Sequence, residues 1–274
     1  MALEDYLDHQ PIGLLSHHYP ADHNRDSFAH TNTLLKRPVA LPPVFVHFWT
    51  TSQTVILGMQ DLRLPQLPQA LAALANWHPF VRNSGGLGVV SDDLVLNCSL
   101  FLPAEASLSI QAAYQLLADL IGQALPEADM TIGEVAHSYC PGSYDLSING
   151  QKFAGLAQRR TSQGIAVMAY LSVAGNQFKR GELMRAFYQA GAAAQAAKFH
   201  YPTIDPTCMN SLDQLLDQPL TVGLMQARLV RVLAQHAAID PLLLPNAIQQ
   251  PAYQAALAEA ASDMTQRQEA LHAR

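Results

Sequence analysis

The chain of 274 residues is long enough to bury a large core in one domain with a smaller appendage. Hydrophobic residues make up 49% of it and charged residues 14%, a composition typical of a globular protein rather than of a disordered chain. The net charge of -6, without any basic cluster, argues against nucleic-acid binding, because phosphate recognition requires a basic surface.

The N-terminus and the cysteines bear on the cellular compartment. The sequence begins MALEDYLDHQ, which has neither the apolar stretch of a signal peptide nor the basic character of a transit peptide. No apolar run reaches the roughly 20 residues that a membrane span requires. Cys98, Cys140 and Cys208 are far apart and lack CxxC spacing, which disfavours disulfides and structural zinc. We therefore expect a cytoplasmic protein with free thiols and no membrane contact.

The N-terminal half predicts a leader followed by short strands and helices. Residues 1 to about 26 are rich in His, Asp and Pro and predict an irregular, solvated leader. No carboxylate or cysteine joins its His17, His18 and His23 at a metal-ligand spacing, so we predict no metal site. Hydrophobic patterning then predicts a helix over 27–36, strands over 44–49 and 54–57, a helix over 65–75, strand-rich structure over 80–91, and a strand over 94–101 with Cys98 in the core.

The C-terminal half is increasingly helical. Leu108, Leu116 and Leu120 lie on one stripe of a predicted amphipathic helix over 107–125, with Ser107 as its N-cap. The later segments predict, in order, strands over 142–148, 151–159 and 166–173 and helices over 180–198, 221–236 and 253–272.

The order of these elements indicates the fold class and the domain organisation. Strands mixed with helices, and then helices alone, favour an α+β fold over a regular βαβ repeat. We expect three parts along the chain: a leader with a short helix (1–38), a main domain (39–218) and a helical C-terminal extension (219–274).

The two strands around Asn149-Gly150 form the clearest predicted motif, because this dipeptide is the preferred loop of a type I′ hairpin. A two-residue loop pairs Ser147 with Lys152, and strand alternation then places Asp145 on the same polar face as Lys152. Pro141-Gly142 allows the preceding loop to fold Cys140 back over this face.

This arrangement suits a cysteine nucleophile. The thiolate is the reactive form, and a nearby ammonium such as that of Lys152 favours it. The ammonium can also donate to an acyl carbonyl as negative charge develops there. Periodicity alone equally fits an incidental cysteine beside a hairpin ion pair. His137, three residues before Cys140, offers a weaker Cys-His alternative.

A glycine-rich segment, Arg82-Asn-Ser-Gly-Gly-Leu-Gly88, follows a predicted strand. Clustered glycines allow a ligand to approach the backbone closely. The segment lacks the Gly-Lys-Ser/Thr of a P-loop and the spacing of a dinucleotide-binding turn, so a phosphate cradle is not predicted. Taken alone, it also fits an ordinary glycine-rich β-turn.

Three segments together resemble the lipoate-protein ligase and biotin ligase superfamily over residues 40 to about 215. RNSGGLGVV resembles its R-x-x-GG-x-x-V element, YDLSINGQKFAGLAQRR resembles its lysine-bearing strand pair, and TVILGMQ resembles its early strand and turn. The resemblance implies an α+β catalytic domain over 39–218, with mixed and antiparallel sheets flanked by helices. It also makes 219–274 a helical extension of that domain.

Within the superfamily, CPGSYDLSINGQKFAGLAQRR is most similar to the N-octanoyltransferases that use octanoylated glycine-cleavage H protein. Those enzymes carry a cysteine twelve positions before the lysine, as Cys140 precedes Lys152 here. The resemblance implies that Cys140 takes the acyl chain as a thioester and that Lys152 activates it. The implied substrate-binding residues are Arg82, Ser84, Gly85, Gly86, Gly88, Asp145, Gly155 and Gln158.

The same resemblance implies the partners: H protein as acyl donor and the lipoyl domains of 2-oxoacid dehydrogenase E2 subunits as acceptors. It implies no cofactor, and we expect a monomer. Octanoyl and lipoyl groups both remain open as the cargo.

Three alternatives to a cysteine-dependent N-octanoyltransferase remain, and the first two are enzymes of the same superfamily. ATP-dependent ligases and carrier-protein-dependent octanoyltransferases usually have His-Gly after the second strand, where this chain has Val167-Met-Ala-Tyr-Leu171. The ligases also need no cysteine at the position of Cys140, although Asp145 matches their aspartate. The third alternative is a non-catalytic protein that binds lipoyl domains.

Overall fold

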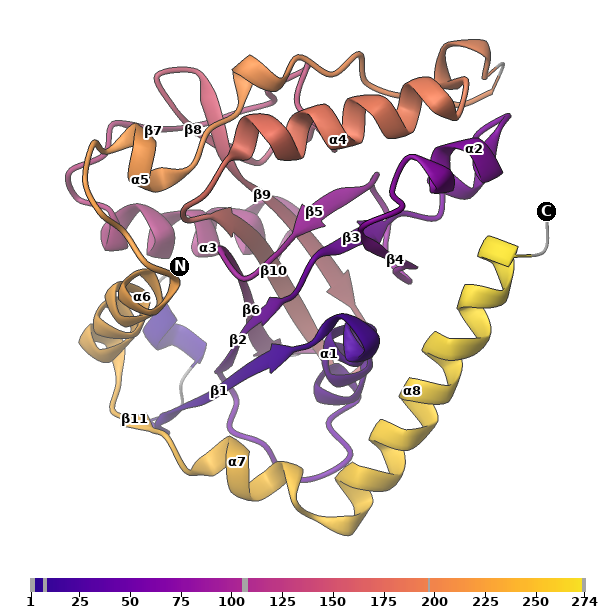
Figure 1. The fold of residues 1–274 in the computed structure, drawn as a ribbon. Helices are drawn as coiled ribbons and strands as arrows, with labels where there is room; N and C mark the ends of the chain where they lie inside the picture. The colour runs from indigo at the N-terminus through magenta and orange to yellow at the C-terminus, as the bar shows by residue number, and fades with distance from the viewer. Residues whose placement is uncertain (1–2, 7–8, 105–107, 197, 273–274) are drawn as a thin grey trace.

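The computed structural model describes residues 3–6, 9–104, 108–196 and 198–272, which fold around two β-sheets (Figure 1). The larger sheet has eight strands, in the spatial order β11 (Ile239–Asp240), β1 (Ile12–Tyr19), β2 (Phe45–Thr51), β6 (Val95–Pro103), β10 (Gly164–Ser172), β9 (Gln151–Arg160), β8 (Asp145–Ile148) and β7 (Met130–Ile132). The smaller sheet has the order β4 (His78–Val81), β3 (Thr54–Leu57) and β5 (Val89–Ser91).

Both sheets are mixed. In the larger sheet β1 runs parallel to its neighbours β2 and β11. The other neighbouring pairs, β2–β6, β6–β10, β10–β9, β9–β8 and β8–β7, are antiparallel. In the smaller sheet β3 is parallel to β4 and antiparallel to β5. The predicted α+β class with mixed sheets is therefore confirmed.

Strand alternation assigns the two faces of the larger sheet. Along β10, Val167, Ala169 and Leu171 join one core cluster, whereas Tyr170 joins a second cluster on the opposite face. The first face is covered by α3 (Ile110–Ala124) and α6 (Val222–His236). The face that carries Tyr170 looks toward α1 (Asp26–Lys36) and the smaller sheet.

The remaining helices are α2 (Leu67–Ala72), α4 (Gln177–Ala190), α5 (Leu212–Leu215), α7 (Leu243–Ile248) and α8 (Pro251–His272), with short 3-10 helices at Leu3–Tyr6, Ala21–His23, Asp61–Arg63, Ala193–Gln195 and Pro206–Cys208. Most of them lie around the second face, but α5 and the 3-10 helix at Leu3–Tyr6 pack into the core cluster of the first face. Figure 1 shows α8, in yellow, running beside α1 toward β4. Its Gln268 pairs with the backbone of Val81, accepting at 2.7 Å and donating at 3.2 Å. None of the described helices is long and apolar enough to cross a membrane.

Most predicted elements are present, with shifted ends. The strand over 54–57 and the helices over 27–36, 221–236 and 253–272 agree with β3, α1, α6 and α8 within two residues. The predicted cap Ser107 lies outside the described residues, and Ser109 caps α3 instead by accepting from the N–H of Ala112. The helix predicted over 180–198 begins at Gln177, after an Asn176 cap, and ends at Ala190.

The prediction of an irregular leader is wrong. Residues 12–19 form β1, which lies inside the larger sheet between β2 and β11. The hydrophobic pattern did not predict this strand, because the polar residues Ser16, His17 and His18 interrupt its apolar residues. His18 and His23 are exposed as expected, but His17 is half-buried.

His17 belongs to a cluster of aromatic side chains between β1, β2, α1 and α8. Its Nδ1 lies 3.2 Å from Nε2 of buried His47 and 3.0 Å from the hydroxyl of Tyr19. The ring of His30 packs 4.8 Å from that of His17, and its Nδ1 lies 3.0 Å from the hydroxyl of Tyr253. Burial lowers the pKa of His47 well below its ordinary value and lowers that of His30 to about 3, so both rings are neutral in the fold.

We expect this cluster to make the fold sensitive to acid. Below its ordinary pKa, His30 binds a proton in the unfolded chain but stays neutral in the fold, so stability falls as pH falls from about 6.5 toward 3. From pH 7 to pH 5 the contribution of His30 to the free energy of unfolding should drop by about 2 kcal/mol. Urea unfolding at both pH values measures this. His30→Gln should lessen the drop and the exposed-site control His18→Gln should not; equal drops in all three proteins would refute the assignment.

Candidate active site

The candidate site is built on the β8–β9 hairpin. Asn149 and Gly150 have positive φ angles of 51° and 75°, as a type I′ turn requires, and Ser147 pairs with Lys152 as predicted. A β-bulge follows, so that Asp145 faces Gly155 rather than Ala154. The bulge shifts the predicted register by one residue but leaves Asp145 and Lys152 in contact.

Lys152 and Asp145 form a buried ion pair. The Lys152 Nζ lies 2.9 Å from Oδ1 of Asp145, and the two side chains are 0% and 2% exposed. The ammonium also donates to Oγ of Ser138 at 3.1 Å, and to the backbone carbonyls of Tyr139 at 3.1 Å and Cys140 at 2.9 Å. Lys152 therefore contacts the backbone of Cys140, and it tethers the loop that carries the thiol.

The carboxylate of Asp145 organises the same loop from its other oxygen. Its Oδ2 accepts from the N–H groups of Val135 at 3.2 Å and Gly142 at 3.1 Å, on either side of Cys140. Burial raises the pKa of Asp145, and the Lys152 ammonium opposes this rise. The ion pair and its hydrogen bonds therefore define the conformation of residues 135–142.

Cys140 itself has a strained backbone and a partly exposed side chain. Its φ of 49° lies in the left-handed region, which a residue with a Cβ adopts rarely and at a cost of about 1–3 kcal/mol. Its Sγ accepts a hydrogen bond from the backbone N–H of Leu87 at 3.2 Å, and Nη2 of Arg82 lies 3.8 Å away. The sulfur therefore faces two hydrogen-bond donors, one from the backbone and one from a guanidinium group.

The glycine-rich loop supplies these donors. Nη2 of Arg82 donates to the carbonyl of Leu87 at 2.9 Å and so closes the loop on itself. Gly86 has a φ of 91°, and a Cβ there would lie 2.5 Å from Nη2 of Arg82 and 3.1 Å from Sγ of Cys140. The loop approaches the thiol so closely that only glycine fits at this position.

A cavity of about 300 Å³ opens in front of Cys140. It is lined by eight of the ten predicted site residues: Arg82, Ser84, Gly85, Gly86, Cys140, Asp145, Gly155 and Gln158. The other two lie behind its wall, Lys152 under the loop and Gly88 against the hydroxyl of Tyr188. A second cavity of about 50 Å³ shares part of this lining and is also bounded by the apolar side chains of Phe28, Trp49 and Met168.

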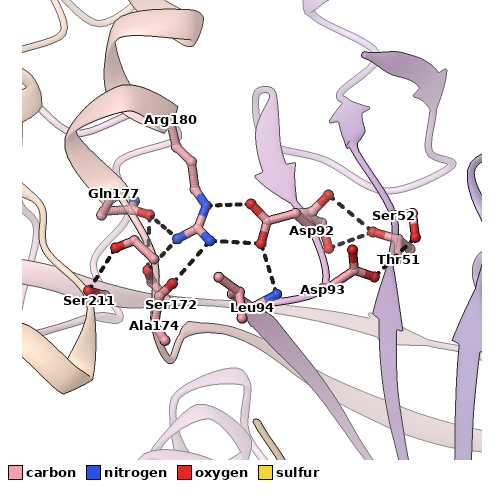
Figure 2. A network of polar contacts seen from close by, with 12 residues as sticks. Thr51, Ser52, Asp92, Asp93, Leu94, Ser172, Ala174, Gln177, Arg180 and Ser211 are labelled. Atoms are coloured by element: carbon pink, nitrogen blue, oxygen red, sulfur yellow. Dashed lines mark hydrogen bonds and ion pairs between the residues drawn. The ribbon is translucent and has the colours of Figure 1, made fainter. Parts of the chain in front are cut away.

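A polar network supports Tyr139, the residue before Cys140. Arg180 on α4 forms a two-pronged ion pair with Asp92, at 2.7 and 2.8 Å, and donates to Oγ of Ser172 on β10 at 3.0 Å (Figure 2). Gln177 accepts from Arg180 and donates to the hydroxyl of buried Tyr139 at 2.7 Å. The network joins both sheets and α4 beneath the loop that carries the thiol.

The other candidate groups lie elsewhere. Cys98 is 3% exposed in the core, as predicted, and burial raises the pKa of its thiol to about 12. Cys208 is half-buried in the 3-10 helix at Pro206–Cys208. His137 is exposed, and its Nδ1 donates to the carbonyl of Thr203 at 3.1 Å. Among the described residues, no group of three or more His, Cys, Asp or Glu is placed to hold a metal ion.

Sequence reasoning missed the backbone donor of Leu87 and the acceptors of Ser138 and Tyr139. A backbone N–H carries no side-chain signal, and only the three-dimensional approach of the loop to Cys140 reveals this one. The position of Tyr139 directly before the cysteine was the available hint for the acceptors.

The fold and this site define a lipoyl protein ligase A/B catalytic domain. The chain belongs to that family, whose model matches residues 23–234. The family resemblance predicted from the three segments is confirmed.

Sequence relatives confirm the narrower resemblance as well. The octanoyl-GcvH:protein N-octanoyltransferase of Anoxybacillus flavithermus is 43% identical over 232 residues, which cover 83% of this chain and 82% of that enzyme. The enzyme of the same name from Macrococcus caseolyticus is 47% identical over 181 residues, 65% of this chain and 66% of its own.

Solved structures agree on the fold. Lipoate-protein ligase A bound with ATP superposes with a TM-score of 0.69 at 14% identity, covering 92% of this chain and 95% of that one. A bi-partite lipoate protein ligase from Thermoplasma acidophilum gives a TM-score of 0.64, also at 14% identity, covering 92% and 91%. At this identity the likeness concerns the fold.

Proposed function

We propose that the chain is a cysteine-dependent N-octanoyltransferase that moves an octanoyl group from the lysine of glycine-cleavage H protein to the lysine of an E2 lipoyl domain. The observation that carries the proposal is the thiol of Cys140 at the cavity, with a backbone donor 3.2 Å from its sulfur. The relatives named for this reaction support it. Beside the nucleophile Cys140, the seven other predicted residues that line the cavity contact the substrate, and Lys152 and Gly88 support them from behind.

The reaction proceeds in two acyl transfers. The Cys140 thiolate attacks the carbonyl carbon of the donor amide, a C–S bond forms, and the C–N bond breaks as the leaving lysine nitrogen takes up a proton. The neutral amine of the acceptor lysine then attacks the thioester. A C–N bond forms, the C–S bond breaks, and a proton is released as the thiolate returns. One amide replaces another, so the exchange needs no ATP.

The apolar side chains around the site suit a medium acyl chain. At about 0.8 kcal/mol for each buried methylene, an octanoyl tail gains roughly 5–6 kcal/mol from leaving water. The second cavity, bounded by Trp49 and Met168, offers apolar contacts for the far end of this tail. The protein acts as a monomer in this proposal.

The decisive experiment omits ATP. We expect the purified protein to transfer the octanoyl group from octanoylated H protein to an apo lipoyl domain without any nucleotide. Intact-mass measurement of the donor and the acceptor proteins detects the transfer. Transfer only from free octanoate with ATP would identify an ATP-dependent ligase. Transfer only from an octanoylated acyl carrier protein would identify a carrier-dependent enzyme. Binding of lipoyl domains without transfer from any donor would identify a non-catalytic binding protein.

A further inference from the structure

A buried carboxylate and a buried phenol lie behind the glycine-rich loop, outside the mechanism given above. Asp61 begins the 3-10 helix after β3 and is 0% exposed, and Tyr188 lies on α4 and is 3% exposed. The Tyr188 hydroxyl donates to Oδ1 of Asp61 at 2.9 Å. Burying a charged group is unfavourable unless it is paired and hydrogen-bonded. The hydrogen bonds of Asp61 and Tyr188 therefore indicate what the pair does in the fold.

The pair contacts the loop from behind at two points. The Tyr188 oxygen accepts from the backbone N–H of Gly88 at 3.1 Å. The other Asp61 oxygen accepts from the N–H of Gly58 at 2.8 Å. Gly58 packs directly on the loop, because a Cβ there would lie 1.8 Å from the carbonyl oxygen of Gly86.

The N–H next to Gly88 in the chain is that of Leu87, which donates to Sγ of Cys140. A hydrogen bond weakens steeply with misalignment, so a small rotation of the Leu87–Gly88 backbone would remove this donor from the sulfur. We propose that Asp61 and Tyr188 are positioning residues that hold the loop so that the Leu87 N–H stays aimed at Cys140. The proposal rests on the acyl-transfer function, because that reaction is what the aimed N–H serves.

The charge of Asp61 orients the phenol. A carboxylate accepts the Tyr188 proton, which leaves a lone pair of the Tyr188 oxygen for the Gly88 N–H. Burial raises the pKa of Asp61 to about 6, against the hydrogen bonds from Gly58 and Tyr188 and the charge of Arg82. Above this pH Asp61 is ionised and the orientation is in place.

Tyr188→Phe tests the proposal, because it removes only the hydroxyl. We expect kcat to fall about 10- to 100-fold while KM changes less than about 3-fold, because the donor is misplaced but the cavity is unchanged. Without substrate, iodoacetamide should alkylate Cys140 about 3- to 10-fold more slowly at pH 7, measured by peptide mass mapping. The control is Tyr201→Phe, whose hydroxyl donates to the carbonyl of Gln60 at 2.8 Å without touching the loop.

A second variant, Asp61→Asn, keeps the shape and removes the charge, and we expect the same direction in both measurements. The proposal is wrong if either variant, folded, alkylates Cys140 at the wild-type rate, or if Tyr201→Phe loses as much as Tyr188→Phe. Alkylation needs no acyl donor. Absence of octanoyl transfer by the wild type would therefore count against the proposed function, while the alkylation rates still decide the positioning role.

Discussion

Replacing Cys140 by serine is expected to lower octanoyl transfer by about 10³-fold or more, the scale seen when a covalent nucleophile is removed. The serine hydroxyl is far less acidic than the thiol, and the groups that contact the sulfur, the N–H of Leu87 and Nη2 of Arg82, are donors that cannot accept its proton. The variant should fold, because the side chain is partly exposed and loses a single sulfur. Transfer from octanoylated H protein, with intact mass of the enzyme, measures both the rate and the thioester.

Cys208→Ser is the matched control, since Cys208 is also a half-buried free thiol. It should keep wild-type transfer and the octanoyl adduct on the enzyme. Transfer by Cys140→Ser at rates close to wild type would refute the nucleophile assignment. Without an adduct it would favour direct transfer between the two lysines, and an adduct that persists in the variant would place the acyl group on another residue.

The hairpin was predictable because its determinants are local. Asn149-Gly150 selects the turn, and alternation from that turn brings Asp145 and Lys152 to one face. The depth of Lys152 was not predictable, because a polar face normally meets solvent. Here Ser138 and Tyr139 fold over it, and the backbone of Asn210 donates to its carbonyl at 3.0 Å. These covering segments are irregular, and periodicity carries no information about where they return.

The donor to the sulfur was beyond sequence reasoning for a related reason. The glycines predicted that the backbone of this loop approaches a ligand closely. The group that approaches the sulfur of Cys140 is the backbone N–H of Leu87, and the identity of a side chain carries no signal for it. Similarly, β1 was hidden because its polar residues, such as His17, find partners on β2 that are distant in the sequence. In each case a long-range contact satisfies a group that local rules assign to solvent or to a turn.

The second large effect is expected at the buried ion pair. Lys152→Met leaves the Asp145 carboxylate without its cation in a site that is 2% exposed, and breaking such a pair typically costs about 3–5 kcal/mol. Transfer should also be lost, because the carbonyls of Tyr139 and Cys140 lose the donor that shapes the loop. Urea unfolding gives the free energy, and the ATP-free assay gives the activity.

The double variant Lys152→Met/Asp145→Asn separates the two roles. Removing both charges relieves the unpaired carboxylate, and the asparagine oxygen can still accept from Val135 and Gly142, so much of the stability should return. Activity should stay low, because no ammonium remains to donate to the Cys140 carbonyl and to hold the loop that carries the thiol. If activity recovers together with stability, Lys152 serves the fold alone, and the thiolate of Cys140 depends on the Leu87 N–H and Arg82 instead.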